Sequence, residues 1–179
     1  MRTSLLALFF VFTAAVNTVN AQVSFKNAVD YNDYIINEQN KIGLAINDFM
    51  KACGKGKLKD MDTRHADVIK QIDASLVAIN AMPAYKGNVG FRNAASELFE
   101  VYKSIAQREY RDIIALMNEG IDVGQNRARF NNVLFKIDEK SKPFSDKFLT
   151  EQIKFAETFK ISLGANELEK QEEQKDAKP

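Results

Sequence analysis

Apolar residues recur along most of the chain at intervals of three and four, the spacing that places side chains on one face of a helix. In the segment 24–52 one row repeats every seven residues; it consists of Ala28, Ile35, Ile42 and Phe49. A second row lies three positions later and repeats at the same interval; it consists of Tyr31, Glu38, Ala45 and Ala52. These two rows are the a and d positions of a helix that packs lengthwise against other helices.

Three further segments show the helical spacing, with glycine or proline between them. They predict helices over residues 61–82, 91–118 and 123–162. The last segment is rich in phenylalanine, and Pro143 is expected to kink or restart it, with Ser141 as the cap of the restarted half. Four amphipathic helices with short connections predict an all-α, up-down-up-down four-helix bundle.

Both ends of the chain depart from this pattern. An apolar run from Leu5 to Val16 follows the basic Arg2, and Ala21 is the small side chain that a signal peptidase requires. Residues 1–21 are therefore predicted to be a secretory signal peptide, cleaved after Ala21, and residues 22–164 to be the bundle domain. The charged residues 165–179 are predicted to be a disordered tail. We expect an exported protein of the bacterial periplasm, cell surface or medium.

Charge narrows the classes of partner. The chain has 25 Lys and Arg against 24 Asp and Glu, and removal of Arg2 with the signal peptide leaves 24 of each. This balance argues against nucleic acid, whose phosphate backbone selects basic proteins, and against electrostatic attachment to anionic lipid. The apolar run from Leu5 to Val16 is too short to span a bilayer as an anchor, and no second apolar stretch of about 18 residues follows it, so no transmembrane segment is predicted.

The segment Tyr31–Ile42, shortly after the predicted cleavage site, resembles the opening helix of an uncharacterised family of bacterial secreted or surface helical proteins. The resemblance implies export and an all-helical fold. It implies no activity and no site residues.

Polar residues at predicted core positions form two layers. If the helices alternate in direction and pack in register, Glu38, Ser75 and Ser141 lie at one height near the middle of the bundle. His65 and Glu109 lie at a second height, near the turn that follows the first helix. A buried carboxylate is costly unless it is paired or hydrogen-bonded, so each layer needs a physical reason.

Two explanations fit these layers. The first is a hydrogen-bonded network that fixes the register of the helices, with His65 bonded to Glu109. The second is a small cavity with aromatic walls, in which Glu38, Tyr102, His65 and Glu109 bind a ligand.

Catalytic and metal chemistry find little support in the residue types. The single histidine excludes the paired Glu-x-x-His motifs of a ferritin-like centre, and the nearest imitation is Asp62-x-x-His65 facing Glu109-x-x-Asp112. Cys53 continues an apolar row and is predicted to be buried rather than nucleophilic. The sequence therefore predicts no catalytic residues, no metal ligands and no cofactor.

These observations predict a non-enzymatic protein, a monomer or a weak dimer, that binds a protein or cell-envelope partner. Its contact surface is expected to be an exposed apolar patch after Pro143, at Phe155 and Phe159. The alternative is a periplasmic carrier of a small ligand or metal that uses the polar layers.

Overall fold

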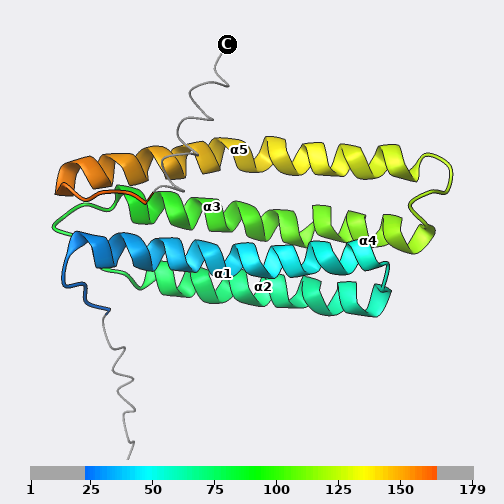
Figure 1. Ribbon diagram of the computed structural model, residues 1–179, viewed down its shortest axis with the longest axis horizontal. Coiled ribbons are helices and arrows are strands. Elements are labelled where there is room, and N and C mark those ends of the chain that lie inside the picture. Colours follow the sequence, from blue (N-terminus) through cyan, green and yellow to red (C-terminus); the bar gives the residue numbers. More distant parts are fainter. Residues whose placement is uncertain (1–22, 165–179) are drawn as a thin grey trace, which may run out of the picture.

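In the computed structural model, residues 23–164 are described, and they form four antiparallel rods built from five helical segments (Figure 1). The segments are α1 (Ala28–Lys55), α2 (Leu58–Asn80), α3 (Gly90–Gln107), α4 (Glu109–Glu119) and α5 (Asn126–Phe159). α4 continues in the direction of α3 and shares its rod. The predicted all-α four-helix bundle is confirmed. The predicted signal peptide and the predicted tail lie outside the described residues.

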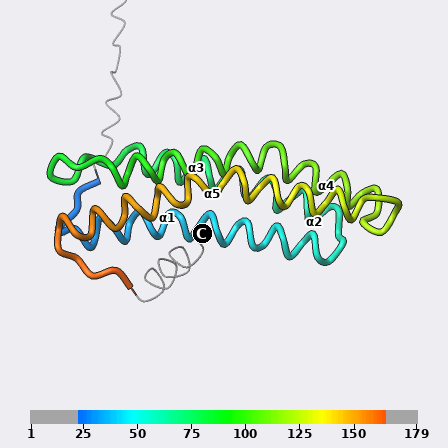
Figure 2. The backbone as a smooth tube through the Cα atoms, turned by 90° about the horizontal axis from the view of Figure 1, so that it is seen from above, coloured from blue at the N-terminus to red at the C-terminus, as the bar shows by residue number. Residues whose placement is uncertain are grey.

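The four rods are not packed equally tightly around the bundle. α1 packs along α2, α2 packs along α3, and α5 packs along both α3 and α4, whereas α1 and α5 make few contacts with each other. Seen from above in Figure 2, α5 runs lengthwise over the other helices, and the connections lie at the two ends of the bundle. The face between α1 and α5 is therefore the least closely packed, and we call it the open side of the bundle.

The ends of α1 show how local sequence sets its length. The side chain of Asn27 accepts a hydrogen bond of 2.9 Å from the backbone N–H of Asp30, which caps the first turn. At the other end Gly56 adopts a left-handed φ of 66°, a conformation that glycine enters without steric cost. Both signals are local, which is why the helix begins and ends close to the expected positions.

The core follows the heptad rows. Ile35, Ile42 and Phe49 of the first row are completely buried, and the apolar face of α2 supplies Ile72 and Ile79 with no exposed surface. Burial of side chains of this size contributes roughly 1.5–3 kcal/mol each. Within residues 23–164 no helix is both long and apolar enough to cross a membrane.

Two predictions about helix continuity are wrong. The third predicted helix is interrupted at Arg108, whose φ of −122° and ψ of −72° are not helical. In contrast, α5 continues through Pro143, and Ser141 lies inside it rather than capping a restarted half. The Ser141 hydroxyl donates to the carbonyl of Ile137 at 2.8 Å, so its hydrogen bond is made within the preceding turn.

The middle polar layer is a hydrogen-bonded network between α1 and α2. The buried Ser75 hydroxyl donates to Oε2 of Glu38 at 2.8 Å, and Lys41 reaches Oε1 at 2.5 Å. Gln71 in turn donates to Ser75 at 3.0 Å. Ser141, which was predicted to complete this layer, instead faces the open side of the bundle. The network satisfies both oxygens of the Glu38 carboxylate.

Replacing Ser75 by alanine removes a donor from a buried carboxylate. We expect Ser75→Ala to lower the free energy of unfolding by about 1–3 kcal/mol, measured by urea denaturation. Ser96→Ala is the matched control, because the Ser96 hydroxyl makes an exposed hydrogen bond of 3.0 Å to Asn80. Its expected effect lies within about 0.5 kcal/mol. Equal stability of the two variants would contradict a structural role for the Glu38–Ser75 contact.

Candidate functional site

The open side of the bundle contains a groove with a volume of about 680 Å³. One wall is α1, which contributes Gln39, Asn40, Gly43, Leu44 and Ile46. The opposite wall and the floor come from the other rods, which contribute Ile137 and Ser141 from α5 and Tyr102, Ile105 and Tyr110 from α3 and α4. We refer to this site as the α1/α5 groove.

None of the ten residues that line the α1/α5 groove is charged. The chain as a whole is 27% charged, so an uncharged surface of this extent on a helical bundle is unusual for its own composition. The polar groups of the groove are amides and hydroxyls, which donate and accept hydrogen bonds without net charge. The groove therefore favours a neutral ligand over an ion.

Tyr102 closes one end of the α1/α5 groove. Its hydroxyl is hydrogen-bonded to the side chains of Ser145 on α5 and Gln39 on α1, so one group bridges the two walls. Burial raises the pKa of this phenol, and the two hydrogen bonds partly offset that effect. Tyr102 was predicted as a candidate ligand-binding residue, and the structure places it in this groove.

Tyr110 supplies a rigid part of the floor. Its ring stacks on Phe49 with 4.8 Å between ring centroids and 23° between the ring planes. Burial, with smaller contributions from Tyr102 and Cys53, raises the pKa of the Tyr110 phenol to about 12. A side chain held in this way is pre-organised rather than free to fill the groove.

Gly43 lies on the α1 wall, within the helix. Glycine in a helix interior is less favourable than alanine by about 1 kcal/mol. A methyl group at this position would meet no atom within 4 Å, so packing inside the described chain does not require glycine here. What the glycine does provide is an exposed stretch of α1 backbone at the edge of the groove.

The other three predicted site residues lie elsewhere. Glu38 belongs to the network with Ser75, His65 donates from Nε2 to the carbonyl of Ala106 at 2.7 Å, and Glu109 pairs with Lys140 of α5. The predicted hydrogen bond between His65 and Glu109 is therefore wrong. The structure does not gather the predicted residues into one cavity.

The break at Arg108 explains the position of His65. The last four carbonyls of a helix have no N–H donor within that helix, and Ala106 is among the last residues of α3. His65 supplies a donor to that carbonyl from the neighbouring α2. On the other side of the break, Glu109 points toward α5 and pairs with Lys140, while its Oε2 has no hydrogen-bond partner among residues 23–164.

A buried amide pair between α1 and α5 was not predicted. Gln152 donates to Oδ1 of Asn32 at 3.0 Å, and both side chains are almost completely buried. The sequence contains a signal for it, because Gln152 lies four residues after Phe148 and three before Phe155, within the apolar face of α5.

The predicted apolar contact surface is also wrong. Phe155 is 1% exposed, and Phe159 packs against the core with its ring centroid 4.9 Å from that of Tyr85. The aromatic residues of α5 after Pro143 thus hold the end of the bundle together. The exposed aromatic residue of this helix is Phe135, which is 60% exposed and precedes Pro143.

The structure also bears on the residues that the sequence suggested for metal binding and for cysteine chemistry. Across residues 23–164, no three His, Cys, Asp or Glu side chains are grouped so that they could hold a metal ion, and this includes Asp62, His65, Glu109 and Asp112. Cys53 is free and buried, as its place in the apolar row predicted.

Comparison of the chain with models of protein families, with curated proteins and with solved structures finds no match. The resemblance of the segment 31–42 to a family of secreted helical proteins therefore stays a prediction.

Burial raises the pKa of the Cys53 thiol to about 11, so little thiolate exists near neutral pH. We expect native protein at pH 8 to react with Ellman's reagent roughly a hundredfold more slowly than a small thiol. Protein unfolded in guanidinium chloride serves as the control and is expected to react completely with one equivalent. Fast reaction of the native protein would contradict the buried position of Cys53.

Proposed function

We propose that this protein is an exported, non-enzymatic binding protein that carries a small, neutral, amphipathic molecule in the α1/α5 groove. The observation that carries the proposal is a groove of about 680 Å³ in which no charged residue takes part. The proposal keeps the binding role expected from the sequence and adopts its alternative, a small-ligand carrier. It moves the site from the polar layers to the open side of the bundle.

The dimensions of the groove favour a small molecule over a polymer. The α1 wall extends from Gln39 to Ile46, which corresponds to about 10 Å of helix at 1.5 Å per residue. Pockets for drug-sized ligands have volumes of roughly 300–1,000 Å³. A partner helix or an extended peptide would need a longer surface than this.

The chemistry of the lining favours an amphipathic ligand. Ile46, Ile105 and Ile137 contribute aliphatic surface, and the amides of Gln39 and Asn40 contribute hydrogen-bonding groups on the α1 wall. A mainly apolar lining with a few polar groups is the usual composition of a small-molecule site, in which the polar groups fix orientation.

Gly43 gives independent support. Glycine at this position lowers the stability of α1, and no packing contact in the described chain requires it. A ligand that lies against the α1 backbone would benefit from the missing side chain.

The lining also supports a binding role over catalysis. It contains no histidine, cysteine, lysine or carboxylate, and the hydroxyl of Ser141 donates to a carbonyl of its own helix. A nucleophile would need an adjacent base to become reactive. The apolar run of residues 5–16 with Ala21 supports export.

The neutral dye N-phenyl-1-naphthylamine, whose fluorescence rises in apolar surroundings, is a suitable probe. We expect saturable binding that Leu44→Lys weakens about tenfold, because a charged side chain then replaces an apolar one at the edge of the uncharged groove. Val77→Lys is the matched control: Val77 is 72% exposed on α2 and Leu44 is 66% exposed on α1. This control is expected to leave the affinity unchanged.

A second variant tests Gly43 directly. Gly43→Leu is expected to raise the stability of α1 while it weakens dye binding about tenfold, because leucine favours helix and occupies the edge of the groove. Absence of saturable binding, or equal weakening by Leu44→Lys and Val77→Lys, would overturn the proposal.

A further inference from the structure

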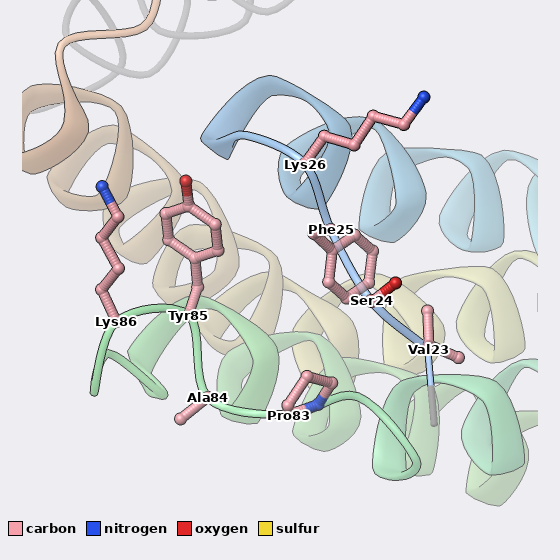
Figure 3. A pocket seen from close by; sticks show the side chains of 8 residues that line it. All are labelled: Val23, Ser24, Phe25, Lys26, Pro83, Ala84, Tyr85 and Lys86. Atoms are coloured by element: carbon pink, nitrogen blue, oxygen red, sulfur yellow. The ribbon is translucent and has the colours of Figure 1, made fainter. Parts of the chain in front are cut away.

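A second cleft lies at the end of the bundle where the chain enters α1. It has a volume of about 410 Å³ and lies between residues 23–26 and the connection from α2 to α3 (Figure 3). Figure 3 shows Lys26 and Lys86 at opposite ends of the cleft, with the rings of Phe25 and Tyr85 between them. The Lys86 side chain runs alongside Tyr85, whereas the ammonium group of Lys26 points away from the cleft. We refer to it as the end cleft. It shares no lining residue with the α1/α5 groove.

The charges of the end cleft have one sign. Lys26 and Lys86 are its two charged lining residues, and no carboxylate contributes to it. Neither lysine forms an ion pair with an acidic residue in the part of the chain that the structure describes. This positive charge is local, since the whole chain is nearly balanced. The cleft therefore favours an anion.

The backbone at Lys86 is unusual for lysine. Tyr85 and Asn88 are joined by two backbone hydrogen bonds of 2.9 and 3.0 Å, and the two residues between them, Lys86 and Gly87, have φ values of 48° and 84°. A turn with two positive φ values strongly favours asparagine followed by glycine. A lysine kept in a left-handed conformation points to a use for its side chain.

The side chain of Lys86 is directed to the aromatic part of the cleft. Its Nζ lies over the ring of Tyr85, 5.7 Å from the ring centroid. The ring of Tyr85 is itself held by Phe155 and Phe159, at centroid distances of 5.6 and 4.9 Å.

The second ring is held in the same way. Phe25 packs edge-on against Tyr31 at 4.8 Å and against Tyr34 at 5.4 Å. Two fixed rings with the ammonium group of Lys86 over one of them form a pre-organised surface for a flat apolar group that carries a negative charge.

We propose that the end cleft binds a small organic anion, an aryl carboxylate or an aryl phosphate. Its charged group lies beside the ammonium group of Lys86, and its ring packs against Phe25 and Tyr85. Lys26 adds positive charge at the far end of the cleft. This ligand carries a charge, whereas the ligand proposed for the α1/α5 groove is neutral, and the two sites share no lining residue.

Calorimetric titration with four probes tests the proposal. In the Leu44→Lys variant, whose α1/α5 groove is expected to bind neutral molecules weakly, we expect 2-naphthoate or 2-naphthyl phosphate to bind at least tenfold more tightly than neutral 2-naphthol, and more tightly than inorganic phosphate, which lacks a ring. The tighter of the two aryl anions identifies the preferred charged group. Equal affinity for 2-naphthol and both aryl anions would overturn the proposal.

Lysine variants locate the site. Lys86→Gln is expected to weaken binding of the aryl anion at least fivefold, and Lys26→Gln is expected to weaken it by a smaller factor. Lys57→Gln is the control, because Lys57 is exposed at the turn between α1 and α2, at the opposite end of the bundle. Weakening by Lys57→Gln equal to that by Lys86→Gln would indicate nonspecific charge attraction and would overturn the proposal.

The variant Lys86→Gly distinguishes a role of Lys86 in anion binding from an effect on the stability of the turn. Glycine adopts positive φ freely, so we expect an unfolding temperature equal to or higher than that of the unmodified protein, together with the same loss of anion affinity as in Lys86→Gln. Unchanged anion affinity in Lys86→Gly would overturn the proposal. Binding of the neutral dye to the α1/α5 groove is expected to be unaffected in all of these variants.

Discussion

The buried hydrogen bond between Asn32 and Gln152 joins the two helices that flank the open side of the bundle. An amide buried without a partner would cost several kcal/mol, so each side chain requires the other in place. The seven-residue step from Asn32 to Gln39 in α1 equals the step from Gln152 back to Ser145 in α5. At that second level the Tyr102 hydroxyl bridges the two helices. These contacts set the antiparallel register of α1 and α5.

The α1/α5 groove begins where these contacts end. Beyond Tyr102, α5 continues along α4, to which the ion pair of Lys140 with Glu109 joins it. α1 instead follows α2, to which the Glu38–Ser75 contact joins it. The two helices thus have different partners, and the floor between them is filled by side chains of α3 and α4. The groove follows from this division of contacts, because α1 and α5 separate where they pack against different helices.

The polar groups of the core have mainly structural roles. Ser75 satisfies Glu38, and His65 satisfies a carbonyl that the end of α3 leaves without a helical donor. The two proposed binding sites lie instead where helix packing stops, at the open side and at one end of the bundle. They differ in charge, because amides and hydroxyls line the groove and two lysines flank the end cleft.

The spacing of apolar residues was sufficient to predict the four rods, the buried face of α1 and the burial of Cys53, because each depends on periodicity within one helix. Counting residues from the turns also correctly predicted that Glu38 and Ser75 lie close together. It failed for His65 and Glu109, since the interruption at Arg108 changes which neighbour each side chain meets. The prediction of an exposed patch at Phe155 and Phe159 failed for a different reason, because an aromatic face on α5 fits a buried end of the bundle as well as an exposed patch. Tyr102 was identified as a candidate, but the groove around it was not. Periodicity determines which face of a helix is buried; the distance between α1 and α5, and therefore the groove, is decided only when all the rods pack together.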